Sequence, residues 1–317
     1  MGEKIRIGVI GTGNMGRNHV RVLSEASDFD LVSVFDVQAE RAHALAMQYH
    51  VSASASAEAL MDAVDAVVIA APSFLHKELG LLAAERGIHA LIEKPLALNC
   101  EDAEILCRAF ANAKKKLMIG HVERFNPVLT ELVKLLNGEE VIAVEAVRYS
   151  PFDGRITDTD VVYDLMIHDI DIVCNALCDQ EIVGISGFGV AVKSGMTDFA
   201  NCLLRFENGV LAKLSASRVT ESKVRMIQVH TLRSYIIADL LNRTLTVLKQ
   251  TNMIVENSNS SYRQESISQR IFVPMVEPLK MELLSLHHCI ANDTEPAING
   301  AHAVKALRVA ADLRNAF

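Results

Sequence analysis

Apolar residues in the first 120 positions follow two alternating patterns: short continuous runs and longer segments with helical spacing. Continuous runs are typical of strands buried on both faces, and apolar residues three or four positions apart are typical of helices. The expected strands are Ile5–Ile10, Leu31–Phe35, Ala66–Ala70, His89–Ile92 and Leu117–Gly120, and the expected helices are Asn14–Ala26, 38–48, Leu75–Arg86 and Glu101–Lys114. This alternation predicts a doubly wound parallel sheet, so residues 1–121 are expected to form a Rossmann-type α/β domain.

After residue 121 the pattern changes to one dominated by strands. Asn126 and Pro127 are expected to be the N-cap and first residue of a helix that ends near Asn137. The further expected elements are strands Val141–Tyr149, Ile182–Val192, Ala200–Phe206, Val210–Ser217, Lys223–Thr231, Ser234–Asp239 and Leu245–Lys249, a flexible polar loop Glu256–Ser268, and helices Glu277–Ala291 and His302–Ala316. The short turn Glu207-Asn208-Gly209 is typical of a hairpin.

Residues 122–317 therefore predict an α+β domain with a large, mostly antiparallel, open-faced sheet for substrate binding and oligomerisation. A sheet face that the chain's own helices leave uncovered would aggregate in water unless another subunit packs on it. We therefore expect a homodimer or homotetramer formed through this sheet.

Composition narrows the function classes. Half of the 317 residues are apolar, 22% are charged and the net charge is −8, so a basic surface for nucleic acid is not expected. No apolar run has membrane-spanning length and no signal-peptide pattern precedes the first strand, which predicts a cytoplasmic protein without membrane contact. The six cysteines are scattered without zinc-like spacing, so no metal is expected.

Three glycines follow the first expected strand in the pattern Gly11-x-Gly13-x-x-Gly16. Gly11 permits a tight turn, Gly13 lets a pyrophosphate approach the backbone, and Gly16 lets the next helix pack against the strand. Asp36, at the end of the second strand, can accept hydrogen bonds from a ribose hydroxyl. Its carboxylate would repel a 2′-phosphate, which predicts NAD rather than NADP. The residues expected to bind the dinucleotide here are Gly11, Thr12, Gly13, Asn14, Met15, Gly16 and Asp36.

Two further segments carry candidate chemistry. Glu93-Lys94-Pro95 follows a strand at the sheet edge where such folds bind ligands, and an ammonium there can stabilise charge that develops on a substrate oxygen. In the expected helix Asp160–Cys178, Val162, Met166, Ile170, Val173 and Leu177 form an apolar stripe, and Asp164, His168, Asp171 and Asn175 form a polar one. Asp164 can orient His168 as a proton acceptor, although an internally paired or solvated polar face is an equal alternative from spacing alone.

Taken together, the glycine pattern, Glu93-Lys94-Pro95 and Asp164-x-x-x-His168 resemble the glucose–fructose oxidoreductase/inositol dehydrogenase (Gfo/Idh/MocA) family along essentially the whole chain. The segments His121–Pro127 and Val161–Asp171 look most like those of UDP-N-acetylglucosamine 3-dehydrogenases. Many relatives carry a glycine run where this chain has Thr159-Asp160-Val161-Val162, which argues against an inositol or free-glucose dehydrogenase.

The resemblance implies roles for individual residues. Lys94 would position the reacting hydroxyl, His168 would be the general base, and Asp164 would orient it. Pro72, Ser73, His76 and Glu93 would complete the cofactor site near the nicotinamide. The candidate substrate contacts are Asn126, Arg124, Arg148 and Arg155, and the last two would bind a pyrophosphate. The alternatives are a helix cap for Asn126, a local ion pair for Arg124, and surface positions for Arg148 and Arg155.

Three functions are compatible with these observations. The leading one is NAD-dependent oxidation at C3 of a UDP-N-acetylhexosamine, with UDP-N-acetylglucosamine as the expected substrate, to a 3-keto sugar. The second is NAD-dependent oxidation of a free polyol or sugar, and the third is a non-catalytic NAD-sensing regulator. The joint presence of Lys94 and His168 favours an enzyme, because a sensor has no need for a proton acceptor and a lysine.

Overall fold

The computed structural model describes residues 4–154, 159–250, 254–255, 262–263 and 266–317, and it divides into two compact units. Unit 1 consists of Met1–Phe125 and Val276–Arg308, and unit 2 of Asn126–Met275 and Val309–Phe317. The predicted division at residue 121 lies close to the first boundary. The C-terminal part of the chain divides differently from the prediction, because it returns to unit 1 before it ends in unit 2.

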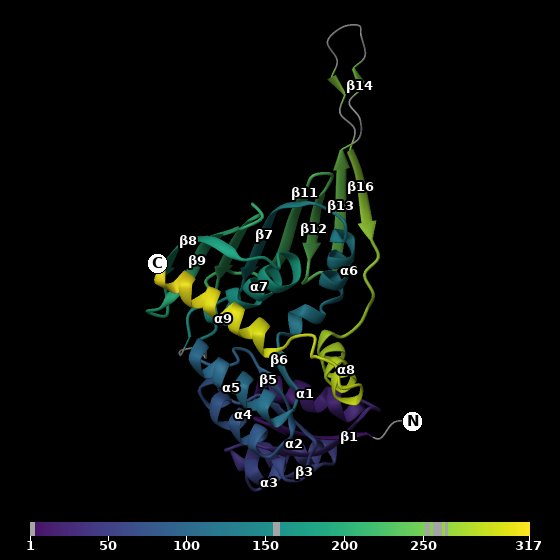
Figure 1. The fold of residues 1–317 in the computed structure, drawn as a ribbon, viewed down its shortest axis with the longest axis vertical. Helices are drawn as coiled ribbons and strands as arrows, with labels where there is room; N and C mark the ends of the chain where they lie inside the picture. Colours follow the sequence, from purple (N-terminus) through teal and green to yellow (C-terminus); the bar gives the residue numbers. More distant parts are fainter. Residues whose placement is uncertain (1–3, 155–158, 251–253, 256–261, 264–265) are drawn as a thin grey trace. The chain divides into compact units, whose positions relative to one another are not determined.

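Unit 1 contains the predicted doubly wound parallel sheet (Figure 1). Its six strands are β1 Ile5–Ile10, β2 Phe29–Phe35, β3 Ser52–Ala53, β4 Ala66–Ile69, β5 His89–Glu93 and β6 Leu117–Gly120. They pair in parallel in the order β3-β2-β1-β4-β5-β6, the order of dinucleotide-binding folds. The carboxyl ends of β1 and β4 meet where the strand order reverses, and ligands of such sheets bind at that point.

The helices of unit 1 confirm the predicted ones and add a short one. They are α1 Asn14–Glu25, α2 Ala39–Tyr49, α3 Ala57–Met61, α4 His76–Glu85, α5 Cys100–Ala113 and α8 Pro278–Ala291, with single turns η1 Ser73–Leu75 and η2 Val122–Phe125. Helix α3 and strand β3 were not predicted, because five and two residues are too short to show an apolar period. Leu279, Leu283 and Leu286 of α8 join the core formed by β1 and α1, which explains why the chain returns to this unit.

Unit 2 contains the predicted large sheet, with eight strands in the order β16-β13-β12-β11-β7-β10-β9-β8. Their bounds are β7 Val141–Tyr149, β8 Ile182–Ala191, β9 Thr197–Phe206, β10 Leu211–Ser217, β11 Val224–Thr231, β12 Tyr235–Asp239, β13 Thr244–Gln250 and β16 Ser266–Ile271. Only the β7–β10 pair is parallel among these described strands. The predicted hairpin turn after Phe206 is present, with Gly209 at a φ of 88°.

The predicted loop over 256–268 is partly wrong. Residues 256–261 and 264–265 lie outside the described residues, but Ser266–Ser268 begin β16, which pairs with β13, and Tyr262–Arg263 form a short strand β15 paired with β14, Ile254–Val255. The segment Ser266–Ile271 is polar and exposed at the sheet edge, so only its pairing with β13 identifies it as a strand.

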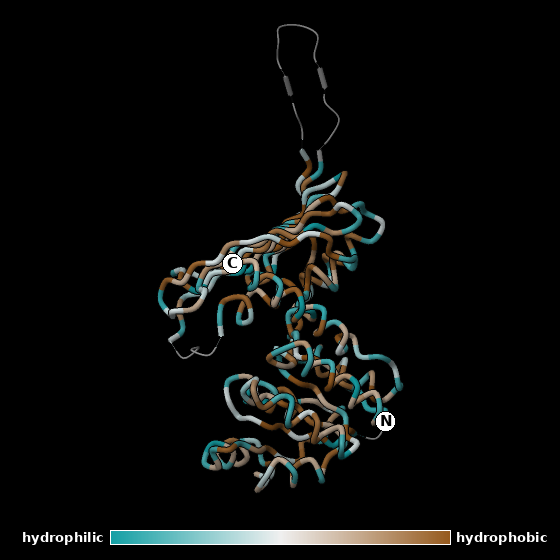
Figure 2. The backbone as a smooth tube through the Cα atoms, turned by 60° about the vertical axis from the view of Figure 1, so that its left-hand side comes forward, coloured by the Kyte–Doolittle hydropathy of each residue, from teal (hydrophilic) through white to brown (hydrophobic). Residues whose placement is uncertain are grey.

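The helical segments of unit 2 are α6 Pro127–Leu136, a helical run over 162–177, and the end of α9 Gly300–Asn315. In Figure 1, α6 and α7 lie in front of the sheet, and hydrophobic segments run along its strands in Figure 2. Among the described residues of both units, no helix is long and apolar enough to cross a membrane.

Candidate active site

The glycine loop after β1 has the geometry that the three glycines predict. Gly11 has a φ of 89°, which favours glycine, and a Cβ on it would lie 2.5 Å from the Ala70 oxygen. A Cβ on Gly16 would lie 1.8 Å from the Gly11 oxygen. At Gly13, by contrast, a Cβ would meet nothing within 4 Å, so open space lies above this backbone where a pyrophosphate would approach.

Helix α1 begins directly at this open space. Its N-cap is Gly13, which has no side chain to bond the first N–H groups, and its first turn has no acidic residue. The N–H groups and the positive end of the helix dipole therefore suit an anion, as a bound pyrophosphate requires. The residues present thus fit a dinucleotide.

Asp36 lies beside the glycine loop. One carboxylate oxygen accepts the Thr12 N–H at 2.7 Å and the Thr12 hydroxyl at 2.8 Å, and the other accepts the Gln38 N–H at 2.9 Å. Burial would raise the pKa of Asp36, but these hydrogen bonds lower it below its ordinary value, so the group is anionic. A carboxylate has about four acceptor positions, which leaves capacity for a ribose hydroxyl.

A pocket of about 520 Å³ opens beside Asp36 within unit 1. Its walls include Ile10, Gly11, Val37, Pro72 and leucines of α4. Ser56, Ala57 and Glu58 at the start of α3 also line it, and sequence reasoning missed them because α3 is so short. Ser56 as N-cap with an acidic residue in the first turn, Glu58, is a helix-start signal that would have found them.

His76, a predicted nicotinamide contact, lies between two backbone carbonyl groups, and its cofactor contact stays a prediction. It is buried, and its Nδ1 lies 2.8 Å from the Pro95 oxygen and its Nε2 2.9 Å from the Ala71 oxygen. Burial lowers the pKa of His76, and a neutral ring has one N–H to donate, so it hydrogen-bonds one of these carbonyl oxygens and packs against the other. His76 thus joins the segment after β4 to the Lys94-Pro95 turn. Pro72 is exposed and Ser73 is half-buried, and their cofactor contacts stay predictions.

Glu93 and Lys94 stand at the carboxyl end of β5, as predicted. Glu93 is 7% exposed; its Oε1 lies 2.8 Å from His19 Nε2, and its Oε2 accepts the Lys94 N–H at 3.3 Å. Glu93 therefore anchors the turn to α1, and its cofactor contact stays a prediction. Lys94 is half-buried, and the Lys94–Pro95 peptide bond is cis.

The predicted helix with the polar stripe is present but unevenly wound. It consists of two π-helical turns, Val162–Met166 and Val173–Leu177, around α7 Ile167–Ile172. Such wide turns are rare and occur frequently at functional sites. Asp164 and His168 are half-buried, one in the first wide turn and the other in α7.

The remainder of the polar stripe is internally paired. The Asn175 Nδ2 donates to Asp171 Oδ1 at 2.9 Å, and both residues are buried. Asp164 and His168 are thus the two stripe residues that keep exposed surface.

Two of the predicted substrate contacts are engaged within unit 2 instead. Asn126 is buried; it caps α6 through the Val128 N–H at 3.1 Å and donates to the Leu240 oxygen at 3.2 Å. Arg148 is 2% exposed and binds both carboxylate oxygens of Asp169 through Nε at 3.1 Å. Asn126 is therefore a helix cap, as the alternative reading has it, and Arg148 anchors α7; the substrate contacts of both stay predictions.

The other two substrate candidates stay predictions. Arg124 lies half-buried in η2 of unit 1, and Arg155 lies outside the described residues.

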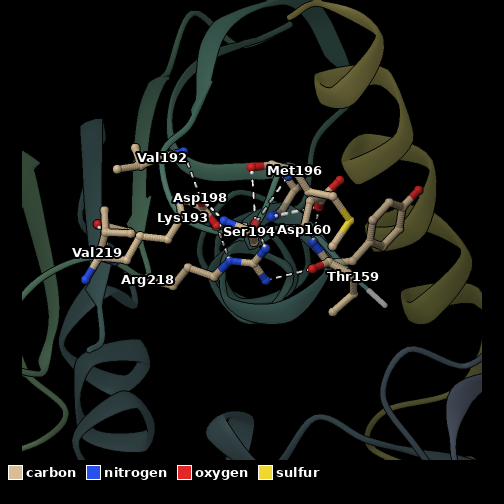
Figure 3. Close-up of polar contacts among 12 residues, drawn as sticks. Thr159, Asp160, Val192, Lys193, Ser194, Met196, Asp198, Arg218 and Val219 are labelled. Atoms are coloured by element: carbon tan, nitrogen blue, oxygen red, sulfur yellow. Dashed lines mark hydrogen bonds and ion pairs between the residues drawn. The ribbon is translucent and has the colours of Figure 1, made fainter. Parts of the chain in front are cut away.

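A buried ion pair holds the segment that leads into the His168 helix (Figure 3). Asp198 accepts the backbone N–H groups of Val192, Lys193 and Ser194, and its Oδ1 lies 2.7 Å from Arg218 Nε. Burial would raise the pKa of Asp198, but the hydrogen bonds from Ser194, the backbone and Arg218 hold it far below its ordinary value. Arg218 also donates to the Thr159 oxygen at 2.7 Å.

The next residue, Asp160, caps the helix itself. Its Oδ1 accepts the N–H groups of Val162 and Tyr163 at 3.0 and 3.1 Å, and its Oδ2 lies 2.7 Å from Arg314 Nε of α9. The helix that carries Asp164 and His168 thus starts from two anchored residues, Thr159 and Asp160.

Replacing Arg218 with methionine is expected to destabilise unit 2 by about 3 kcal/mol, because it leaves the Asp198 charge buried without its cation. The backbone donors and Ser194 still bind Asp198, which keeps the loss at the lower end of the usual range for a broken buried ion pair. Denaturant unfolding measures the effect, with Arg233→Met in the exposed turn between β11 and β12 as the control. Equal midpoints for the two variants would contradict the anchoring role.

Comparisons with known proteins agree with this geometry. Residues 5–121 match the oxidoreductase family with an NAD-binding Rossmann fold, and residues 141–235 match the GFO/IDH/MocA C-terminal domain. The chain is 37% identical over 243 residues to a UDP-N-acetylglucosamine 3-dehydrogenase of Acidithiobacillus ferrooxidans, covering 77% of this chain and 76% of that protein. It is 28% identical over 251 residues to an inositol 2-dehydrogenase of Rhizobium meliloti, covering 74% and 76%.

A solved structure of UDP-N-acetylglucosamine 3-dehydrogenase from Acidithiobacillus ferrooxidans has the same fold. It superposes with a TM-score of 0.91 at 31% identity, over 99% of this chain and 98% of that one.

Proposed function

The chain belongs to the GFO/IDH/MocA family of NAD-binding oxidoreductases, and from this premise we propose that it is a UDP-N-acetylglucosamine 3-dehydrogenase. In this reaction the C3 hydroxyl of the sugar is oxidised to a ketone and NAD is reduced. The observation that carries the proposal is the similarity to the Acidithiobacillus enzyme, at 37% identity in sequence and a TM-score of 0.91 in structure.

The proposed roles of the residues follow from their chemistry. When bound, NAD accepts the hydride from the carbon that carries the reacting hydroxyl. His168 would take the hydroxyl proton, since an imidazole changes its charge near neutral pH, and Asp164 would orient the ring. Lys94 would donate to the same oxygen and stabilise its developing negative charge. The fixed Glu93-Lys94 turn supports this assignment, because a positioned donor stabilises more than a mobile one.

The second candidate, a free polyol or sugar dehydrogenase, is supported by the matches to inositol 2-dehydrogenases at 28–31% identity. It is the weaker candidate because those matches are less similar than the UDP-sugar enzyme.

The substrate prediction is tested by following NADH formation at constant NAD with four substrates: UDP-N-acetylglucosamine, free N-acetylglucosamine, glucose and myo-inositol. We expect turnover with the UDP-sugar, with kcat/KM for the free sugars lower by about two orders of magnitude or more, because they lack the nucleotide binding energy. Turnover with myo-inositol alone would replace the proposal by the second candidate. No turnover together with tight NAD binding would support a sensor.

The proposed assembly is a homo-oligomer formed through the outer face of the unit 2 sheet. Leu203 on β9 and Leu211 on β10 point outward and are 55% and 53% exposed, and Phe188 on β8 is 83% exposed. Exposed apolar side chains on adjacent strands are typical of a subunit interface. Leu203→Glu together with Leu211→Glu is expected to lower the mass measured by light scattering to that of a monomer, and an unchanged mass would exclude this face.

A further inference from the structure

Three buried titratable side chains gather behind the Glu93-Lys94 turn in unit 1. His19 comes from α1, Glu93 from the end of β5 and Glu282 from α8. One ring nitrogen of His19 and one carboxylate oxygen of each glutamate lie within 4.8 Å of one another. His19 and Glu282 are both 0% exposed. The glycine and Glu-Lys-Pro motifs account for the position of Glu93, but they give no reason for Glu282, a carboxyl group in the core.

The hydrogen bonds of the cluster are distributed unevenly. Glu93 has His19 Nε2 at 2.8 Å from one oxygen and accepts the Lys94 N–H at 3.3 Å with the other. Neither oxygen of Glu282 has a hydrogen-bond partner among the described residues. Donors favour the ionised form of the carboxyl group that receives them, and a buried group without donors favours its neutral form.

Full charge on two neighbouring buried carboxylates is unfavourable, because each repels the other and both lose hydration. We propose that Glu282 is a positioning residue for Lys94: it is held as a neutral carboxylic acid, so that Glu93 stays ionised and keeps its bonds to His19 and the Lys94 backbone. The positioning role rests on the proposed function, in which Lys94 acts on the substrate oxygen.

The electrostatics of the cluster agree with this assignment. Burial, and then the charge of Glu93, raise the pKa of Glu282 well above its ordinary value. The two elements packed against α8 carry further charged groups. Arg21 of α1 pairs with Glu277 and lies within 3.8 Å of Glu25, α1 also carries Arg17, and η2 carries Glu123 and Arg124. Ionisation of Glu282 would repel Glu93 and loosen the turn that presents Lys94.

The protonation state has a measurable consequence for stability. The folded state holds a proton on Glu282 that the unfolded state releases above about pH 4.5. The wild-type protein therefore loses stability as the pH rises from about 4.5 toward the raised pKa of Glu282 in the folded state. Glu282→Gln carries no such proton. The Tm of this variant relative to wild type should therefore increase by about 4 °C between about pH 5.5 and about pH 8.5.

The matched control is Glu277→Gln on the same helix, which loses an ion pair with Arg21 at a partly exposed position. Its Tm difference from wild type should stay nearly constant over the same pH range. A constant difference for Glu282→Gln as well would overturn the neutral state of Glu282. This measurement needs no substrate, so its outcome is independent of the proposed function.

The positioning role is tested by comparing two isosteric changes. Glu282→Gln resembles the neutral acid and should keep kcat within about twofold of wild type. Glu93→Gln removes the carboxylate that hydrogen-bonds His19 and the Lys94 N–H. This variant should lower kcat about tenfold and leave the Kd for NAD nearly unchanged. The reverse order, with Glu93→Gln tolerated and Glu282→Gln impaired, would place the proton on Glu93 and overturn the proposal.

A measurement on the wild-type protein keeps the test valid if a variant fails to fold. The infrared spectrum of the wild-type protein at about pH 8 should contain the carbonyl band of a protonated buried carboxylic acid. Its absence, or a stoichiometric divalent metal found in the purified protein by elemental analysis, would show that Glu282 is ionised and would overturn the proposal.

Discussion

Replacing Lys94 with alanine is expected to lower kcat about 10³- to 10⁴-fold, while the Kd for NAD changes by less than about threefold. The side chain extends from the carboxyl end of β5, where it is half-buried, and its backbone N–H is fixed by Glu93. Under the proposed function its ammonium stabilises charge on the reacting oxygen, which develops only during the reaction. Its loss therefore lowers kcat more than it weakens ground-state binding.

Steady-state kinetics and calorimetric titration with NAD measure the two quantities separately. Lys280→Ala, an exposed lysine on α8 of the same unit, is the control and should leave both unchanged. If Lys94→Ala retains wild-type kcat, the assignment of Lys94 is wrong. If it loses NAD binding in proportion to kcat, Lys94 belongs to the cofactor site instead.

The sequence predicts the parts of the fold that are encoded locally. Strands β1, β4 and β5 are continuous apolar runs, and the glycines and Asp36 fall at fixed offsets from them, so their order alone predicts the dinucleotide site. The return of α8 to unit 1 could not be predicted. The apolar spacing of Leu279, Leu283 and Leu286 indicates a buried helix face but does not identify the core that it joins.

The internal partners of individual side chains could not be predicted, because these partners lie far away along the chain. Arg148 was expected to meet a phosphate, but its guanidinium binds Asp169, 21 residues later. Asn126 was expected near substrate, but its amide donates to Leu240, 114 residues later. A polar side chain close to a motif has the same sequence signature whether it binds a ligand or another residue. Only the folded chain distinguishes the two.

Two alanine substitutions in the glycine loop should fail in different ways. Gly13 has a φ of −68° and open space around it, so Gly13→Ala should fold with a Tm within about 2 °C of wild type. Its methyl group would occupy the space where a pyrophosphate approaches, and the Kd for NAD should rise about tenfold or more. Gly16→Ala would place a methyl group 1.8 Å from the Gly11 backbone oxygen. The strand and helix must separate, at a cost of about 4 kcal/mol or more.

Thermal unfolding and NAD titration of both variants distinguish these effects. Gly16→Ala should lower the Tm by about 10 °C or more, whereas Gly13→Ala should affect binding alone. A Gly13→Ala protein that binds NAD as tightly as wild type would mean that the dinucleotide does not approach this backbone. A Gly16→Ala protein of wild-type stability would contradict the close contact between α1 and the β1 turn, on which the orientation of the helix dipole toward the cofactor depends.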